Sequence, residues 1–188
     1  VETKDREERL PSVTIDNIEA TYEATKHLLA KGIKNIAFVG VKKDAANAWG
    51  YRFLGYEKAL KEAGIEVDED LVFLQNLKYK TGHDAAEKFL KVDKKIEGVV
   101  CASDEIAMGV INGLREKGIN TPDDVSVIGF NNNAIASYFY PRLTTVNQPS
   151  YDMGSVAMRM LIKILNNKPL EEDQYVLDHN LIQRESCK

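Results

Sequence analysis

Short apolar runs rich in β-branched residues alternate along this chain with amphipathic stretches of helical period. The apolar runs predict strands at 12–15, 36–39, 71–74, 98–102, 125–129 and 143–146. Apolar residues at helical spacing predict helices at 18–29, 49–60, 80–91 and 104–117. Because strands that alternate with helices are typical of βαβ units, the chain is predicted to form an α/β fold around a parallel sheet.

Three predicted helices end in the same way. Gly32, Gly64 and Gly118 each follow the last periodic residue, and each is followed by an isoleucine. A left-handed glycine followed by an apolar contact is a common helix C-cap, so these positions are expected to join helices to strands.

The pattern changes after the strand at 143–146. A long amphipathic helix is predicted at 150–166, followed by strands at 174–177 and 180–184. The first ten residues carry seven charges and are expected to be solvated or frayed.

Length, net charge and cysteine content limit the classes of protein to which this chain can belong. The chain has 188 residues, enough for one substantial core or for one complete lobe and part of a second. Its net charge of -4 gives no basic surface for nucleic acid. It has no run of membrane-spanning length, and no signal-peptide core is present in "VETKDREERL". Cys101 and Cys187 form no disulfide framework, which favours a reducing compartment, with Cys101 a buried thiol.

Ligands of open parallel sheets bind at the carboxyl ends of the strands, and here amides cluster at those ends. Asn131, Asn132 and Asn133 follow one strand and Gln148 follows the next. Amides both donate and accept hydrogen bonds without bringing in a charge, which favours holding a polar molecule over transforming it. The alternative is a plain turn, a frequent use of asparagine. We expect Asn131 to line the ligand site, and Asn132 and Asn133 to make the turn.

Charged residues near the same edge allow two interpretations each. Arg52 is predicted near the start of its helix, where a cation opposes the helix dipole, so it either binds an anionic or polar group or extends into solvent over neighbouring aromatics. Ser103 and Asp104 stand at the start of the helix at 104–117. They either serve as an N-cap followed by an acidic first turn, or contact a ligand, or do both.

Catalytic patterns are missing from the sequence. There is no G-x-S-x-G, P-loop or G-x-G-x-x-G motif, and His27, His83 and His179 lack metal-ligand spacing. We therefore expect no enzyme, no metal and no cofactor. The aromatic stretch Tyr138, Phe139 and Tyr140 is either an association patch or a core plug, and we favour the patch.

Several motifs in order resemble the effector-binding region of LacI/GalR transcriptional regulators. They are "HLLAKGIKNIAFVG", "YRFLGYEKALKEAGI", "VVCASDEIAMGVINGLREKGINTPDDVSVIGFNNN" and "PRLTTVNQP", and the resemblance runs from near residue 10 to the end. "QPSYDMGSVAMRMLIKIL" and "HNLIQRES" look most like the catabolite control protein A branch of that family.

The resemblance implies a periplasmic-binding-protein-like fold, a doubly wound parallel sheet with one complete lobe and part of a second. Residues 1–17 would be a charged leader and the last strand of an N-terminal lobe, and 18–146 the C-terminal effector-binding lobe. Residues 147–173 would be a crossover and a helix returning to the N-terminal lobe, and 174–188 the terminal strands.

By position, the family's effector contacts fall on five residues: Arg52, Ser103, Asp104, Asn131 and Gln148. The family usually has an aspartate where Asn131 stands. The change removes a charge-assisted hydrogen bond of about 1.5–3 kcal/mol and argues against a tightly held free sugar. Leu77 stands where sugar-responsive members carry an aromatic residue, which argues the same way.

In the catabolite control branch, the corepressor is the phosphocarrier protein HPr phosphorylated on serine. Its contacts would fall on the helix at 150–166, at Tyr151, Asp152, Met158, Arg159 and Lys163. Arg159 and Lys163 are four residues apart and suit a phosphate, although a plain solvated face explains them equally well. A tail position that is basic in that branch is Asn180 here.

The resemblance thus predicts the regulatory part of a cytoplasmic, homodimeric repressor of carbon catabolite control. Its effector would be a sugar or phosphosugar, serine-phosphorylated HPr, or both, acting by population shift. Operator DNA would be bound only through a headpiece absent from this chain, and no membrane is involved. The alternative is a periplasmic sugar-binding protein of a transport system, in which a signal peptide would replace the headpiece.

Overall fold

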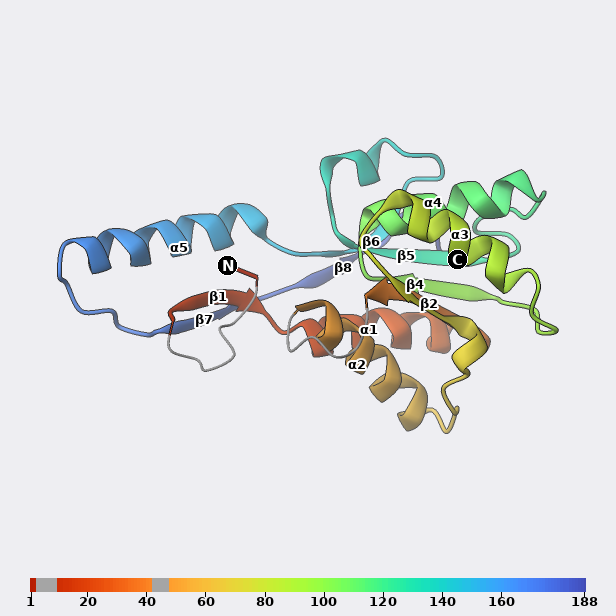
Figure 1. Ribbon diagram of the computed structural model, residues 1–188, viewed down its shortest axis with the longest axis horizontal. Coiled ribbons are helices and arrows are strands. Elements are labelled where there is room, and N and C mark those ends of the chain that lie inside the picture. Colours follow the sequence, from red (N-terminus) through yellow and green to blue (C-terminus); the bar gives the residue numbers. More distant parts are fainter. Residues whose placement is uncertain (3–9, 42–47) are drawn as a thin grey trace.

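The computed structural model describes residues 1–2, 10–41 and 48–188, which form two separate sheets and five α-helices (Figure 1). The helices are α1 (Asn17–Ala30), α2 (Ala48–Glu62), α3 (Tyr79–Phe89), α4 (Asp104–Glu116) and α5 (Ser150–Leu165). The strands are β1 (Ser12–Ile15), β2 (Ile36–Val41), β3 (Val72–Gln75), β4 (Gly98–Cys101), β5 (Ser126–Asn131), β6 (Thr144–Asn147), β7 (Gln174–Leu177) and β8 (Asn180–Ile182). Two short 3₁₀ helices are η1 (Glu69–Leu71) and η2 (Ala134–Ser137).

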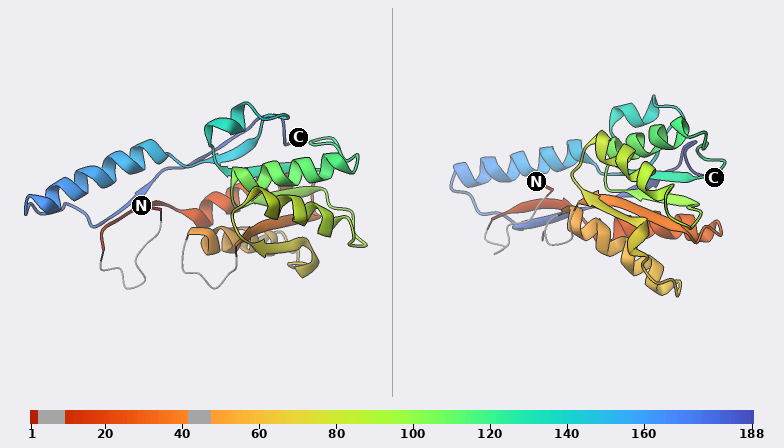
Figure 2. Two further views of the ribbon diagram at one scale, coloured as in Figure 1. Left: turned by 45° about the horizontal axis from the view of Figure 1, so that its top comes forward. Right: turned by 45° about the vertical axis from the view of Figure 1, so that its right-hand side comes forward.

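The larger sheet has six strands in the order β3-β2-β4-β5-β6-β8. The first five are parallel, and β8 joins the edge antiparallel to β6. Helices α1 and α2 cover one face and α3 and α4 the other, as Figures 1 and 2 show. This layering is that of a doubly wound α/β fold, and the predicted fold class is confirmed.

The second sheet is small and stands apart. In the described part of the chain it consists of β1 and β7, which pair in parallel from Ser12 opposite Gln174 to Ile15 opposite Leu177. Helix α5 contacts β1 and extends away from the main sheet beside it (Figure 1). The chain passes between the two sheets at three places: after β1, between β6 and α5, and between β7 and β8.

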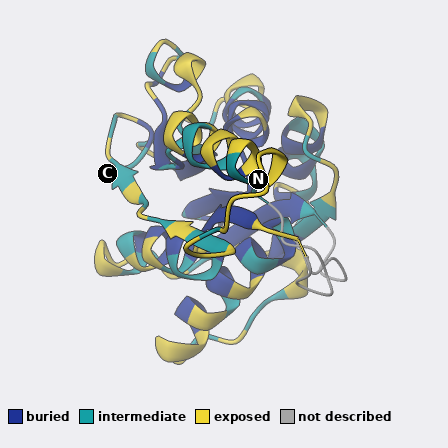
Figure 3. Ribbon diagram, turned by 90° about the vertical axis from the view of Figure 1, so that its left-hand side faces the viewer, coloured by how far each residue is buried: buried dark blue, intermediate teal, exposed yellow. Residues whose placement is uncertain are grey.

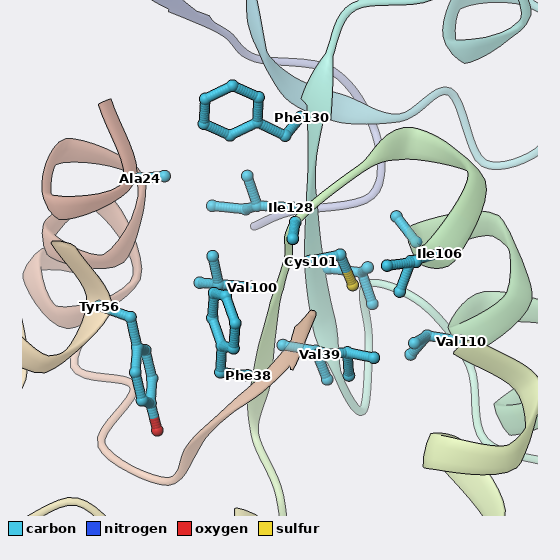
Figure 4. Packing of buried hydrophobic residues seen from close by; sticks show 14 of the residues in the cluster. Ala24, Phe38, Val39, Tyr56, Val100, Cys101, Ile106, Val110, Ile128 and Phe130 are labelled. Atoms are coloured by element: carbon cyan, nitrogen blue, oxygen red, sulfur yellow. The ribbon is translucent and has the colours of Figure 1, made fainter. Parts of the chain in front are cut away.

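The core lies on both faces of the six-stranded sheet. Strand β4 is buried along its whole length, as expected for a parallel strand covered on both faces. Phe38, Val100 and Ile128 come from three neighbouring strands and pack toward Tyr56 of α2 (Figure 4). The exposed residues of the helices face outward (Figure 3). Burial of these side chains removes apolar surface from water and holds the layers together.

The helix ends follow the signals in the sequence. Gly32, Gly64 and Gly118 have φ of +81°, +70° and +76°, so the three predicted glycine caps are confirmed. Asp16 caps the start of α1 by accepting hydrogen bonds from the backbone N–H groups of Ile18 and Glu19.

The predicted elements are all present, and no bound differs by more than two residues. Strand β3 begins at Val72 because Asp68 caps the 3₁₀ turn of Glu69–Leu71 in front of it. The strand predicted at 180–184 ends at Ile182, since the side chain and backbone of Arg184 bond to the β5–β6 edge instead. The charged leader falls mostly on residues 3–9, outside the described residues.

Candidate functional site

A fully buried arginine occupies the junction between the two sheets. Arg52 of α2 has no exposed surface, and its Nε donates to Asn17 Oδ1 at 2.9 Å. Its Nη1 donates to the carbonyl of Ala102 at 2.7 Å. Its Nη2 donates to Glu2 Oε1 at 2.9 Å and to Gln148 Oε1 at 3.2 Å. The side chain therefore ties helix α2 to segments beside β1, after β4 and after β6.

The environment of Arg52 keeps its charge compensated. The guanidinium carbon lies 3.7 Å from the centroid of the Phe130 ring, a cation–π contact. Burial lowers the pKa of Arg52 to about 10, and the Glu2 carboxylate acts in the opposite direction. Arg52 is a cation at neutral pH. The alternative of a solvent-extended arginine is wrong, because the side chain is enclosed.

The first residues of α4 form a second polar cluster at the same edge. Ser103 is the N-cap, and its Oγ accepts from the backbone of Ile106 at 3.3 Å. Asp104 accepts from Thr145 Oγ1 at 2.5 Å and from the backbone N–H of Asn133 at 2.7 Å. Burial raises the pKa of Asp104 to about 6, against the lowering effect of these hydrogen bonds. Asp104 thus fixes the loop after β5.

The asparagine turn differs from the prediction. Asn131 and Asn132 have φ of +103° and +55°, whereas Asn133 has φ of -58° and precedes η2. The turn is therefore made by Asn131 and Asn132, not by Asn132 and Asn133, because asparagine tolerates a left-handed backbone and the register of β5 ends at Asn131. Asn131 Oδ1 is buried and has no hydrogen-bond partner among the described residues, an unusual state for a polar atom.

A chain of amide hydrogen bonds connects this turn to both later crossovers. Arg184 Nη2 donates to Asn132 Oδ1 at 2.7 Å, and Asn132 Nδ2 donates to Asn147 Oδ1 at 3.0 Å. Asn147 Nδ2 in turn donates to Asn180 Oδ1 at 3.1 Å. Asn147 precedes the crossover into α5, and Asn180 follows the crossover from β7. The turn after β5 is thereby linked to the segments that join the two sheets.

A hollow of about 240 Å³ lies beside Arg52, at the junction of the two sheets. It is lined by Glu2, Thr14, Ile15, Asp16, Asn17, Ile18, Ala48, Tyr51 and Val176. Two of these, Glu2 and Asn17, hold Arg52, but none of the five predicted effector residues lines the hollow itself.

The five predicted effector residues do gather at one edge of the sheet. Arg52 contacts Gln148 directly, and its Nη1 binds the carbonyl just before Ser103. Sequence reasoning missed Glu2 and Asn17. Ligands of parallel sheets bind at the carboxyl ends of the strands, and Asn17 follows the strand at 12–15, so this rule could have predicted Asn17. No feature of the neighbouring sequence predicts a role for Glu2.

The predicted corepressor contacts lie on α5. Tyr151 and Met158 are 87% and 56% exposed, and Asp152 and Arg159 are also exposed. Lys163 is partly buried and donates to Glu171 Oε1 at 2.8 Å. The helix thus presents apolar and basic groups to solvent, with Lys163 already engaged in an exposed ion pair.

The aromatic stretch is divided between surface and core. Tyr138 and Tyr140 are 84% and 79% exposed, whereas Phe139 is partly buried against the core. Two of the three predicted interface side chains therefore face solvent.

Two features of the described structure bear on metal binding and on membrane association. Among residues 1–2, 10–41 and 48–188, no three His, Cys, Asp or Glu side chains are grouped so that they could hold a metal ion. In the same part of the chain, no helix has the length and apolar character needed to cross a bilayer.

The fold and the polar junction are those of a ligand-binding α/β protein, and comparisons with known proteins agree. Residues 25–187 match the model of the periplasmic binding protein-like domain. The chain is 60% identical over 186 residues to the HTH-type transcriptional regulator RegA of Clostridium saccharobutylicum, covering 99% of this chain and 56% of RegA.

Solved structures show the same relationship. The transcription regulator CcpA of Lactococcus lactis superposes with a TM-score of 0.90 at 42% identity, covering 99% of this chain and 68% of that one. The transcriptional regulator CelR, in a complex with cellobiose, gives a TM-score of 0.88 at 34% identity, covering 95% of this chain and 55% of that one.

The chain therefore belongs to the periplasmic binding protein-like domain family, as an effector-binding domain of the LacI/GalR type. The resemblance stated from the sequence, including that to the catabolite control branch, is confirmed. The reported relatives are transcriptional regulators and not enzymes or transport proteins, which supports the regulator over the periplasmic alternative. The chain spans about half the length of the curated relatives it matches.

Proposed function

We propose that this chain is the regulatory and dimer-forming part of a DNA-binding repressor of carbon catabolite control that works in the cytoplasm. The observation that supports it is the buried Arg52, which bonds to Glu2 beside the small sheet and to Gln148 in the crossover. A ligand that moves one sheet relative to the other must either preserve or break these two hydrogen bonds of Arg52. Ligand binding at this junction shifts the population between two arrangements.

The division of the chain follows from this proposal. Residues 1–17 belong with the small sheet, 18–146 form the effector-binding lobe, 147–173 return to the small sheet, and 174–188 supply the terminal strands. The separate pairing of β1 with β7 and the contact of α5 with β1 support this division.

The proposed effector contacts are Arg52, Ser103, Asp104, Asn131 and Gln148, with a sugar or phosphosugar as effector. The main support is Asn131, whose backbone is left-handed and whose buried side-chain oxygen Oδ1 has no hydrogen-bond donor in the described part of the chain. Strained and unsatisfied groups cluster where proteins bind ligands, and a ligand hydroxyl would supply the missing donor. The CelR relative is described in complex with a sugar, cellobiose.

The proposed protein partner is serine-phosphorylated HPr, bound on α5 through Tyr151, Asp152, Met158, Arg159 and Lys163. Arg159 makes no ion pair with any residue of the described chain, and its fork geometry suits a phosphate. The exposed Tyr151 and Met158 supply apolar contact area on the same helix. Lys163 must leave Glu171 to contact the phosphate, and an exposed ion pair of this kind is weak enough to permit it.

The proposed homodimer contact contains the aromatic stretch Tyr138, Phe139 and Tyr140, which projects after η2. Exposed tyrosines are enriched at protein interfaces. Operator DNA is bound through a headpiece outside these 188 residues, consistent with the net charge of -4 of this chain.

Calorimetric titration of the full-length protein with serine-phosphorylated HPr tests the proposal. We expect binding that weakens roughly 10- to 100-fold in Arg159→Ala, the equivalent of one charge-assisted hydrogen bond to phosphate. Lys80→Ala is the matched control, because Lys80 is an exposed cation of α3 paired only with Asp84 in the described chain. Equal loss in both variants, or no binding to the phosphorylated protein, contradicts the proposal.

A further inference from the structure

One guanidinium closes the base of the loop that carries the exposed aromatic side chains. This loop, residues 132–143, leaves β5 at the asparagine turn, contains η2 and leads into β6 (teal, above β5 and β6 in Figure 1). Arg184 of the C-terminal tail donates from Nη2 to Asn132 Oδ1, at the start of the loop, at 2.7 Å. Its Nη1 donates to the carbonyl of Leu143, at the end of the loop, also at 2.7 Å. A single side chain therefore holds both ends of the loop.

The tail that carries Arg184 is itself fixed to the sheet. The backbone N–H of Arg184 donates to Thr144 Oγ1 at 2.9 Å. Ser186 is buried, and its Oγ donates to the carbonyl of Val127 at 2.6 Å and accepts from the backbone N–H of Thr144 at 2.8 Å. These hydrogen bonds connect the tail to both β5 and β6. The guanidinium of Arg184 thus extends from a backbone that is bonded to the two strands between which the loop runs.

Between its two ends the loop has an anchored part and an exposed part. Ala136 and Leu143 are fully buried, and the N–H of Leu143 donates to the carbonyl of Ala136 at 2.8 Å. Ile135, Tyr138 and Tyr140 are exposed. Side chains on a loop that is already ordered lose less conformational freedom when a partner binds, and such preorganisation strengthens association. The fixed base of this loop therefore favours binding through its exposed part.

We propose, on the basis of the homodimer contact proposed above, that Arg184 is a positioning residue for self-association. It holds the loop 132–143 in the shape in which Tyr138 and Tyr140 meet the second copy of the chain. Because the same guanidinium holds Asn132, the asparagine turn and the dimer contact are coupled. A change at Asn132, at the base of the loop, alters association through Arg184.

The test is subunit exchange of the full-length protein, followed by energy transfer between donor-labelled and acceptor-labelled copies. Exchange measures the dissociation rate even of a tight dimer, and most changes of affinity within one interface appear in that rate. We expect Tyr140→Ala to accelerate exchange, because the loop forms the contact. Arg184→Met should accelerate it about 10-fold, since the loop must then be ordered during association.

A second variant separates positioning of the loop from a general loss of stability, and it does not depend on the folding of Arg184→Met. Asn132→Ala removes one acceptor of the guanidinium, so it should accelerate exchange about 3-fold in the wild type and no further in Arg184→Met. An effect of general destabilisation would add to that of Arg184→Met. Two controls should leave the rate unchanged. They are Gln183→Met, where the native side chain contacts His27 of α1, and Asn147→Ala, which removes the side-chain bond between Asn132 and Asn147.

Three outcomes overturn the inference while the dimer contact stands, which acceleration by Tyr140→Ala shows. They are an exchange rate of Arg184→Met equal to that of the wild type, an unchanged rate in Asn132→Ala, and additive effects of Asn132→Ala and Arg184→Met. If Tyr140→Ala leaves the rate unchanged, the dimer contact proposed above is wrong, and the role of Arg184 is wrong with it.

Discussion

Replacing Arg52 by methionine should destabilise the protein by about 3–5 kcal/mol. Methionine keeps much of the length of the side chain, so the change removes the charge and the donors more than the packing. Asn17 Oδ1, the Ala102 carbonyl and Gln148 Oε1 each lose a donor in a buried place, at about 1 kcal/mol or more apiece. The Glu2 side chain is 32% exposed, so water replaces part of its lost partner. The sum matches the loss seen when one member of a buried pair is removed.

Urea unfolding followed by the fluorescence of Trp49, the single tryptophan of this chain, measures the effect. Arg142→Met is the matched control, because Arg142 makes an exposed ion pair with Glu185 at 2.7 Å and its loss should change the stability far less. Arg52→Lys should recover less than half of the loss, since an ammonium cannot reproduce the fork. An Arg52→Met variant within about 1 kcal/mol of the wild type would refute the role given to Arg52.

Three other perturbations have defined outcomes. The pKa of Asp104 is raised to about 6 in the folded state, so the free energy of unfolding of the wild type should gain about 2 kcal/mol relative to Asp104→Asn as pH falls from 7.5 to 4.5; a pH-independent difference between the two would contradict this. Gly109→Ala should destabilise by several kcal/mol in thermal melts, because a Cβ there would lie 2.0 Å from a backbone oxygen of α3, whereas Gly154→Ala, in open space, should be neutral or stabilising. In a double-mutant cycle, Asn132→Ala and Asn147→Ala should couple by about 1 kcal/mol, and additive losses would argue against the amide chain.

The secondary structure could be predicted because its signals are local. The glycine caps, Ser103 as N-cap, and the strand at 98–102 depend on residues within a few positions of one another. The carboxyl-end rule also placed Arg52 and Gln148 near the same edge, and the structure shows them in contact.

The remaining features depend on residues far apart in the sequence. Glu2 accepts a hydrogen bond from Arg52, which is 50 positions away in the sequence, and no pattern around Glu2 predicts this contact. The pairing of Ser12 with Gln174 and the antiparallel entry of β8 depend likewise on the tertiary arrangement. The sequence predicted the turn after β5 one residue too late, at Asn132 and Asn133. The register of the strand, which decides which asparagine adopts the left-handed backbone, cannot be read from neighbouring residues.

Hydrogen exchange of the full-length protein, with and without serine-phosphorylated HPr, tests the central claim most directly, because it reports on each segment separately. The claim is that a partner on α5 alters the joint between the two sheets. We predict slower exchange along α5 together with a change at 147–149 and 12–17, the segments tied through Arg52. Protection confined to α3 and α4, with α5 and the joint unchanged, would contradict it.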